Sequence, residues 1–577
     1  TTANASTGME PENEPRPSHY QLAIHAQKST PEVRLQQKQL HTVRDLGRDE
    51  MQLSAGEPVK LHGPSAGFST SAQNHNSPFQ GLRTELHVRW PEWCTVSFYA
   101  ALVALAIPFH EPWADEAQAW QLARCLSLPA LFKTYIRYEG SPGLWYFLLW
   151  ILNRAHIGYT GLHWICGVIA LAAASLLVFA SPLPRYLKLT LPFTYFLMFQ
   201  YAVIARNYVL VPILLFIVAY CWKKSPLVVA LVLGLLANTA LHAAVISGGL
   251  AVVYGVEHLR NGSLNSSIHR RKLLLGALIV IAFYAFAIWT AWPPHDLALS
   301  RVRGESSSLL AHAVGSLVFS ICEPWGLSIP FWIIIAAWFV ARRKLLFLLP
   351  VLFFALFSAE VHFSWWHLGL LLPLMVCLLW ITWPAPGTVP SRYENIGRFA
   401  MIFMIATHLL WSGYALVYDH YNRYSPDRAA AEFLKPFVQN GDKIAVTYIV
   451  NQGDTALGFS GVGILPYFDH NIYINQANSF WWWSDLDSTE DRFNEVLPTH
   501  PQLVLVEVRY KHPVDWIDLN RPRFKSVQKA GFRFSKAYCG THPERLDLGL
   551  TICHVIFQYA DGIPSTVDSQ TYVPVSR

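Results

Sequence analysis

The sequence predicts a multi-pass α-helical membrane protein of about 11 to 13 helices, followed by an extracytoplasmic α/β domain. Of the 577 residues, 53% are hydrophobic and only 14% are charged. Apolar stretches near the roughly 20 residues that cross a bilayer follow one another from Trp93 to Val417. From Asp419 onward the pattern of a globular domain returns. The chain therefore divides into residues 1–92, a membrane domain at 93–418 and a C-terminal domain at 419–577.

Residues 1–92 are polar and rich in Gln, Ser, Pro, Asn and His. They contain no apolar run long enough to build a core, so we expect a disordered cytoplasmic tail. The polar start of the sequence shows no cleavable signal peptide. The net charge of +6 is modest, and the basic residues cluster in loops. This distribution favours orientation in a membrane over binding to nucleic acid.

The membrane domain contains thirteen apolar stretches, each of a length that favours a helix within or across the bilayer. In order, they are Cys94–Phe109, Gly143–Leu152, Leu162–Ala180, Leu189–Ala205, Val209–Trp222, Pro226–Ala237, Ala240–Val256, Leu273–Trp292, Leu309–Cys322, Pro330–Ala341, Leu345–Phe357, Leu368–Trp383 and Phe399–Val417.

Basic residues orient these stretches, because Lys and Arg concentrate in cytoplasmic loops. Arg83 and Arg89 place the tail inside, and the basic clusters at 223–224, 269–272 and 342–344 should lie inside as well. All of these basic residues can lie inside only if two of the thirteen apolar stretches do not cross the membrane.

The two stretches predicted not to cross are Gly143–Leu152, which is short and follows Ser-Pro-Gly, and Leu309–Cys322. We expect the first to lie along the interface or to dip into it. The count of crossings is then 11. With this orientation the outer face receives the acidic and imidazole groups of the loops, and the inner face receives mostly basic clusters. The outer set comprises Asp115, Glu116, Glu139, Arg206, Tyr208, His242, His295, Asp296, Glu360, His362 and His367.

The most informative motif is the acidic pair Asp115-Glu116, which follows the first apolar stretch within His110-Glu-Pro-Trp-Ala-Asp-Glu-Ala-Gln-Ala-Trp120. Two adjacent carboxylates at a membrane surface are costly to hold near hydrocarbon, which indicates a chemical role. We predict that both are catalytic, with Asp115 as a base that takes a proton from an acceptor hydroxyl or amine. The alternative is that they cap the helix that begins here, since 117–124 is helix-forming.

A phosphate that leaves during such a transfer needs a cation or metal to hold it. Arg206 is the predicted clamp, because its planar guanidinium binds phosphate in a bidentate way; the alternative is an arginine that snorkels at a helix end. Glu139 is either a site residue or an ordinary interfacial charge. Each outer imidazole is either a ligand or a structural group, and the structural role is the one expected for most of them. No two of them have the i, i+4 spacing of a metal-binding helix beside a base.

Four stretches resemble the GT-C fold membrane glycosyltransferases, in particular the superfamily of protein mannosyltransferases and lipid A aminoarabinose transferases. Trp113-Ala-Asp-Glu-Ala-Gln-Ala-Trp120 is similar to the acidic motif in the first outer loop of that family. Tyr138-Glu-Gly-Ser-Pro-Gly-Leu-Trp-Tyr146 looks like its Glu-Lys/His-Pro-Pro-Leu-Tyr-Tyr segment. Tyr201-Ala-Val-Ile-Ala-Arg-Asn-Tyr208 and Asn238-Thr-Ala-Leu-His242 resemble a later helix start and a further outer turn.

The resemblance covers about Trp93 to Trp292 and implies roles for individual residues. Asp115 matches the family's catalytic base. Glu139 matches a metal or substrate contact, and His295 is the nearest match to a histidine that joins it, so the resemblance implies a divalent metal cofactor in some members. Tyr208 and His242 fall in motifs expected to contact substrate.

The sequence also departs from the family pattern. Ser141 and Gly143 replace parts of the usual Pro-Pro motif, which changes the shape expected of that loop. Asn207 stands where many relatives carry Pro or an acid, so a second carboxylate used by some members is absent.

In the C-terminal domain, an amphipathic helix from Arg428 precedes a buried strand at 444–450, and further strands are indicated at 503–508, 532–538 and 550–557. This alternation predicts a small α/β domain with a mixed sheet.

Two further features of the C-terminal domain leave alternatives open. Among eight cysteines without a CxxC pair, Cys539 and Cys553 flank a predicted turn and could pair outside the cytoplasm. The aromatic run Phe480-Trp-Trp-Trp483 looks exposed and suited to sugar or the membrane interface, or alternatively packs against the membrane domain.

The leading hypothesis is an enzyme that transfers a sugar from a polyprenyl-phosphate donor to a lipid, glycan or protein acceptor at the outer face of the membrane. The expected location is a bacterial inner membrane, with the active site and the C-terminal domain periplasmic. One alternative is a transporter or flippase for lipid-linked sugars, which predicts polar residues at mid-membrane and related halves. Another is a non-catalytic membrane scaffold, in which Asp115 is dispensable.

Overall fold

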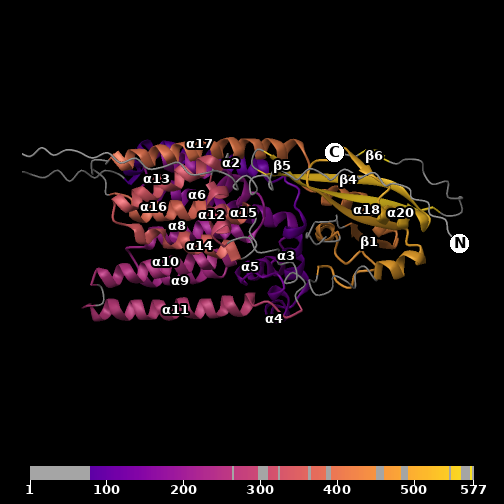
Figure 1. Cartoon of the computed structure of the whole chain (residues 1–577), viewed down its shortest axis with the longest axis horizontal. Coiled ribbons are helices and arrows are strands. Elements are labelled where there is room, and N and C mark those ends of the chain that lie inside the picture. The colour runs from indigo at the N-terminus through magenta and orange to yellow at the C-terminus, as the bar shows by residue number, and fades with distance from the viewer. Residues whose placement is uncertain are drawn as a thin grey trace, which may run out of the picture. The chain divides into compact units, whose positions relative to one another are not determined.

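The computed structural model describes residues 78–262, 265–296, 309–321, 325–360, 365–384, 392–449, 461–481, 492–544, 547–560 and 572–574. In this part of the chain a group of apolar helices comes first and a domain built on a sheet follows (Figure 1). This is the predicted fold class, a multi-pass helical membrane protein with a C-terminal α/β domain. Most of the predicted tail, residues 1–77, lies outside the described residues, but residues 78–92 are helical rather than part of a disordered tail.

The long apolar segments form helices close to their predicted limits. Their bounds are α2 (Pro78–Ala106), α6 (Tyr159–Ala180), α8 (Leu210–Cys221), α9 (Pro226–Ala237), α10 (Leu241–Arg260), α11 (Ser267–Ala291), α12 (Leu309–Ile321), α13 (Ser328–Ala341), α14 (Leu349–Glu360), α15 (Trp365–Leu368), α16 (Leu371–Thr382) and α17 (Arg392–Tyr421).

Local sequence sets where several of these helices begin or bend. Ser225 caps α9, accepting a hydrogen bond from the Val228 N–H at 3.5 Å, and Pro226 occupies the first helical position, where its missing N–H does no harm. Ser266 caps α11 in the same way. Helix α2 is kinked at Arg89, two residues before Pro91, because proline cannot continue the hydrogen-bond ladder.

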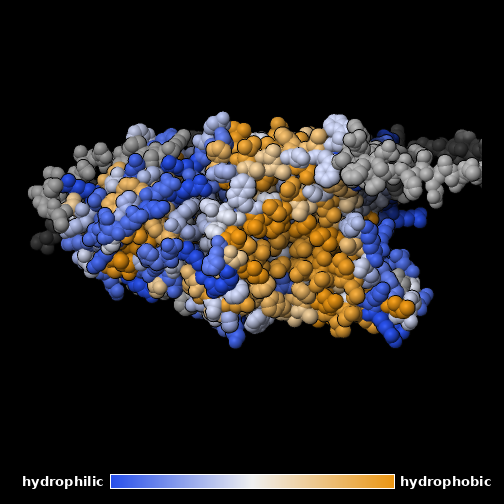
Figure 2. Space-filling view, turned by 180° about the vertical axis from the view of Figure 1, so that it is seen from behind, coloured by the Kyte–Doolittle hydropathy of each residue, from blue (hydrophilic) through white to orange (hydrophobic). Residues whose placement is uncertain are grey.

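Four helical segments are long and apolar enough to cross a membrane: Tyr159–Ala180, Ser267–Ala291, Trp365–Thr382 and Arg392–Tyr421. Helix α11 leaves large apolar side chains such as Leu274, Leu278, Ile281 and Ile288 exposed. In water such a surface would be unfavourable, whereas lipid tails solvate it. Figure 2 shows this apolar surface over the helices and a hydrophilic surface over the C-terminal domain. The chain is therefore an integral membrane protein.

The helix ends sort into two groups, as the predicted topology requires. One end of the bundle carries His110, Arg206 and Asp419. At the opposite end, Arg185 pairs with Glu92 at 2.7 Å. At the same end Lys344 pairs with Glu257 at 3.0 Å, the Trp222 indole N–H donates to Glu257, and Arg342 pairs with Glu394. The basic loops around residues 222 and 344 thus lie together. Which side of the membrane this end faces remains a prediction.

The stretch Leu189–Ala205, predicted as one helix, is instead broken. It consists of the end of α7 (Arg185–Thr190), a 3₁₀ turn η2 (Leu191–Phe193) and a π turn η3 (Phe196–Gln200), followed by irregular backbone up to Arg206. Pro192 removes a donor from the ladder, and side chains from Tyr195 to Ala205 are buried in the bundle. Non-helical backbone at membrane depth is tolerated only when protein encloses it. The break leaves the N–H of Ala205 available to a side chain.

Helix α5 (Leu144–Arg154) has 11 residues and is about 16 Å long at 1.5 Å per residue, roughly half of a hydrocarbon core. Helices α8 and α9, which are predicted to cross, have only 12 residues each, so length does not decide the matter, and the expectation that α5 does not cross stays a prediction. Helix α12, the other stretch predicted not to cross, has 13 residues and packs against α13 and α14.

The C-terminal domain contains a four-stranded mixed sheet in the order β1-β2-β5-β4. Strands β1 (Ile444–Ile449) and β2 (Leu503–Tyr510) are parallel, with Ile444 opposite Leu503; β5 (Asp547–Tyr559) is antiparallel to both β2 and β4 (Phe532–Glu544). Helices α18 (Asp427–Gln439) and α20 (Pro522–Lys529) accompany the sheet, and β3 (Trp516–Asp518) pairs with β6 (Tyr572–Pro574). The first seven residues of β2 are buried, which explains its nearly continuous apolar sequence.

Two open questions about this domain are settled by the structure. Cys539 and Cys553 form a disulfide between facing positions of β4 and β5. Phe480 and Trp481 are buried rather than exposed, and Phe480 packs against Tyr135 with ring centroids 5.2 Å apart. The alternative that this aromatic run packs against the membrane domain is therefore confirmed for these two residues; the rest of the run lies outside the described residues.

Candidate active site

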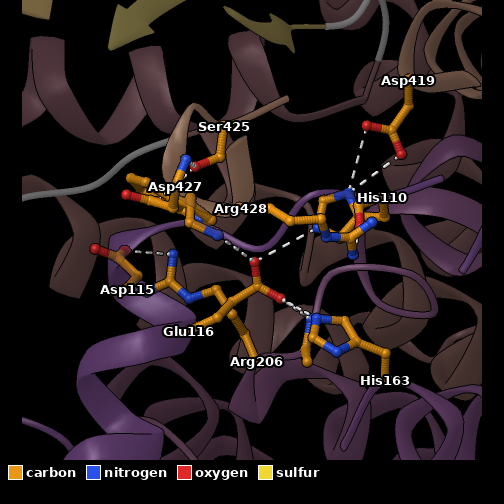
Figure 3. Close-up of polar contacts among 11 residues, drawn as sticks. His110, Asp115, Glu116, His163, Arg206, Asp419, Ser425, Asp427 and Arg428 are labelled. Atoms are coloured by element: carbon orange, nitrogen blue, oxygen red, sulfur yellow. Dashed lines mark hydrogen bonds and ion pairs between the residues drawn. The ribbon is translucent and has the colours of Figure 1, made fainter. Parts of the chain in front are cut away.

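The predicted acidic pair lies where the helical bundle meets the C-terminal domain. Helix α3 (Ala114–Cys125) starts here, four residues after His110, and the broken segment ends here at Arg206. Figure 3 shows Asp115 facing Arg206, whereas Glu116 points to the other side, toward His110 and His163. Neighbouring residues on a helix point about 100° apart, which allows the two acids to face different surroundings here.

Asp115 and Arg206 form an ion pair with Arg206 Nη1 2.9 Å from Asp115 Oδ2. Each side chain keeps 19% of its surface exposed, among residues that are almost all buried. The guanidinium of Arg206 lies 5.2 to 5.9 Å from the ring centroids of Trp113, Tyr208 and Trp366. This aromatic surround favours a cation and holds the planar fork in place. The predicted base and the predicted phosphate clamp are therefore in direct contact.

Glu116 has a different environment, being 1% exposed with both carboxylate oxygens occupied. Its Oε2 accepts the N–H of Trp113 at 3.1 Å, and its Oε1 accepts the N–H of Ala205 at 2.6 Å. The first bond is that of a helix N-terminal cap, as in the alternative interpretation of the acidic pair. The prediction that Glu116 shares the chemistry of Asp115 does not fit this burial. The geometry makes Glu116 a positioning residue that ties α3 to the broken segment.

Two imidazoles also converge on Glu116. His163 Nε2, from α6, lies 3.0 Å from Oε1, and His110 Nε2 lies 3.4 Å from Oε2. Burial alone would raise the pKa of Glu116, but its hydrogen bonds with His110 and His163 outweigh this and hold the pKa well below its usual range. Asp419, from α17, accepts from His110 Nδ1 at 3.1 Å. Burial alone would lower the pKa of His110, but the carboxylates of Asp419 and Glu116 raise it to about 10.

The C-terminal domain holds α3 through side chains that bind backbone groups. The Gln118 amide makes two hydrogen bonds with the backbone of Trp481, donating to its carbonyl at 2.7 Å and accepting from its N–H at 2.8 Å. Arg124 donates to the carbonyl oxygens of Leu465 and Phe468, and Arg428 donates to that of His110 at 3.1 Å. The loop from His110 to the start of α3 is thus held from both sides, by the bundle and by the C-terminal domain.

The other predicted site residues lie at different distances from this pair. Tyr208 contacts Arg206, and His367 packs edge-on against Tyr208 at 5.6 Å. His242 stacks on His367 with ring centroids 4.4 Å apart. Ring contacts therefore connect Arg206 to His242 through Tyr208 and His367. Glu139 lies beyond Gln118 and accepts a hydrogen bond from Gln118 Nε2 at 2.8 Å.

The predicted metal pair of Glu139 and His295 stays a prediction. His295 is exposed in the loop after α11, and its neighbour Asp296 accepts a hydrogen bond from Tyr138. Among the described residues, the group of three ligand-bearing side chains within metal-binding distance is His110, Glu116 and His163, and it includes neither Glu139 nor His295. His362, another residue expected at this face, lies outside the described residues.

Sequence reasoning missed His110, His163, Asp419 and Trp366. His163 carried a signal, since an imidazole inside an otherwise apolar membrane stretch is expensive unless it has a partner. Asp419 lies about 300 residues from its partner His110, and nothing local in the sequence indicates their contact.

A largely apolar cavity of about 580 Å³ lies beside the site, lined by α4 (Leu128–Lys133), α5, α9 and α11. Its wall includes Leu144 and Asn238, which are joined by a backbone hydrogen bond at 3.0 Å. Asn207, next to Arg206, donates to the adjacent Thr239 carbonyl at 2.8 Å. The cavity is therefore separated from Arg206 by a few residues. Its phenylalanine and tryptophan side chains suit an aliphatic ligand.

No protein-family model matches the sequence, and no curated protein matches it. Among solved structures, the crystal structure of ArnT from Cupriavidus metallidurans bound to undecaprenyl phosphate is similar to this chain. The similarity covers 80% of this chain and 97% of that one, with 11% sequence identity and a TM-score of 0.45.

Proposed function

We propose that this protein is a membrane glycosyltransferase that moves a sugar from a polyprenyl-phosphate donor to an acceptor hydroxyl or amine, with Asp115 as the base. The observation that carries the proposal is the partly exposed pair of Asp115 and Arg206 at the edge of an otherwise closed core. An acid that only capped a helix would not need an arginine enclosed by three aromatic rings.

In this proposal Arg206 exchanges one partner for another during the reaction. When no donor is bound, its guanidinium is paired with Asp115. A donor phosphate competes for the same N–H groups, because guanidinium binds phosphate and carboxylate in the same bidentate manner. Binding of the donor then releases the Asp115 carboxylate to accept a proton.

The chemical step is a single displacement at the anomeric carbon of the donor sugar. Asp115 takes the proton of the acceptor O–H or N–H while the acceptor atom forms its bond to that carbon. The bond from carbon to phosphate oxygen breaks, and its electron pair leaves with the polyprenyl phosphate. Arg206 stabilises the negative charge that develops on this phosphate.

The apolar cavity supports a lipid-borne substrate. Phe132, Phe147, Phe286 and Trp289 line it, and it opens from helices of the membrane domain. A polyprenyl chain placed there would leave its phosphate near Asn207 and Arg206. By the orientation of the basic loops, the site and the C-terminal domain would be periplasmic in a bacterial inner membrane.

The test is transfer of radiolabelled sugar from polyprenyl-phosphate donors to endogenous acceptors, using membranes with matched expression of each variant. Asp115→Asn should reduce transfer by about 100-fold or more, as expected when a general base is removed. Asp469→Asn, an exposed carboxylate of the C-terminal domain, is the matched control and should keep full transfer. Equal transfer by Asp115→Asn, or none by the wild type with any of several donors, would favour the transporter or scaffold hypothesis.

A further inference from the structure

We infer that His110, Glu116 and His163 bind one divalent transition-metal ion, most suitably zinc, at the junction of four structural elements. This inference does not rest on the proposed transferase activity, since the cluster is buried behind Asp115 rather than exposed with it. The three ligand atoms, two imidazole nitrogens and a carboxylate oxygen, all lie within 4.8 Å of one another.

The donor set is the first argument for an ion. Two histidines and one carboxylate form a common protein ligand set for zinc and for other first-row divalent ions. Both imidazoles direct Nε2 toward the same carboxylate, at 3.0 Å and 3.4 Å. The longer of these distances is poor for a hydrogen bond but compatible with two ligands of one ion.

Hydrogen bonding around the ligands is the second argument. Asp419 accepts from Nδ1 of His110, so Nε2, the nitrogen that faces Glu116, is the one that would serve as a ligand once its proton is displaced. Metal-bound histidines in proteins generally have such a carboxylate or carbonyl partner. The Trp113 and Ala205 N–H groups each use one lone pair of Glu116, leaving the second lone pair of each oxygen for an ion.

Charge balance is the third argument. The carboxylates of Glu116 and Asp419 are both buried, at 1% and 3% exposure. A divalent cation would balance these two carboxylates with both imidazoles as neutral ligands, and buried charge that is not balanced is strongly unfavourable. The ion would replace the proton that otherwise lies between His110 Nε2 and Glu116, so binding releases a proton.

Such an ion would join the end of α2, the start of α3, α6 and, through Asp419, the end of α17. Asp115 directly precedes one of its ligands. The ion would thus position the loop that carries the proposed base without touching the substrate.

The test uses the full-length protein, purified in detergent with a tag that does not bind metal. We expect elemental analysis to find about one ion per chain in the wild type, zinc or another first-row metal. His163→Gln keeps an amide N–H that can donate to Glu116 but loses the imidazole ligand, and it should lose most of the metal. His408→Gln is the matched control, because His408 is a buried histidine of α17 whose Nε2 donates to the Ile321 carbonyl. It should retain the metal.

Two further measurements keep the inference testable if His163→Gln does not fold. Cobalt(II) added to chelator-treated wild type should give visible ligand-field bands that saturate at about one equivalent, as an ion with imidazole and carboxylate ligands does. Asp419→Asn should weaken metal binding by about 10- to 100-fold, as loss of such a hydrogen-bond partner does. A wild type that holds no metal after incubation with zinc, manganese, iron(II) and cobalt, or equal metal in a folded His163→Gln variant, would overturn the inference. The cluster would then be a proton-shared ion-pair network.

Discussion

Replacement of Gln118 by leucine should loosen the contact between α3 and the C-terminal domain. Gln118 is 2% exposed and makes three hydrogen bonds, two with the Trp481 backbone and one with Glu139. Leucine fills a similar volume but leaves the N–H and carbonyl of Trp481 without these partners. Each bond contributes about 0.5–1.5 kcal/mol net, and a buried group left unpaired costs about 1–3 kcal/mol. We expect the opening free energy around Trp481 to fall by about 2–4 kcal/mol.

Amide hydrogen exchange read by mass spectrometry measures this opening directly. A loss of about 2–4 kcal/mol corresponds to an exchange rate at the Trp481 amide that is about 30-fold to several hundred-fold higher. Gln121→Leu is the matched control, because Gln121 lies one turn further along α3, is fully buried, and finds no hydrogen-bond partner among the described residues. It should change exchange at Trp481 by less than about threefold, since no bond to that segment is lost. Equal effects of the two substitutions would refute the assignment of the contact to Gln118.

Three other predictions follow from the site and the C-terminal domain. Arg206→Lys keeps the charge but loses the planar fork, so kcat/KM for the polyprenyl-phosphate donor should fall by about 10- to 100-fold; an unchanged value would exclude a phosphate clamp. Replacing both Cys539 and Cys553 by serine should lower the stability of the C-terminal domain by up to about 3 kcal/mol, measured by urea unfolding, since the disulfide closes a loop with a separation of 14 residues. Burial, with the nearby Arg509, lowers the pKa of His542 to about 3, so His542 stays neutral in the folded protein. Because an unfolded histidine titrates near 6.5, the unfolded state binds the extra proton, and stability should fall by roughly 2 kcal/mol from pH 6.5 to 5. In His542→Gln this part of the acid sensitivity should vanish, and an unchanged pH slope would contradict the reasoning.

Much of the membrane architecture is predictable because bilayer thickness and charge act on local sequence. The apolar stretches become helices near their expected limits, and the loops with Trp222 and Lys344 meet at one end of the bundle as the charge rule requires. The break between Leu189 and Arg206 was not predictable from hydropathy, since the segment is apolar on average and only Thr190, Thr194 and Gln200 interrupt it. Pro192 was a local signal, but enclosure by neighbouring helices decides whether such a break is tolerated.

In the candidate site, too, some features were predictable from the sequence and others were not. The sequence by itself determined that an acidic pair and Arg206 belong to one end of the bundle, since hydropathy and charge fix which loops share a side. Only the tertiary structure decided that Asp115 pairs with Arg206 while Glu116 turns into the core. It also decided that His110 meets Asp419 and that the C-terminal domain fixes α3 through Gln118. These contacts join residues tens to hundreds of positions apart, and their geometry depends on how whole helices pack, which local patterns of residues do not encode.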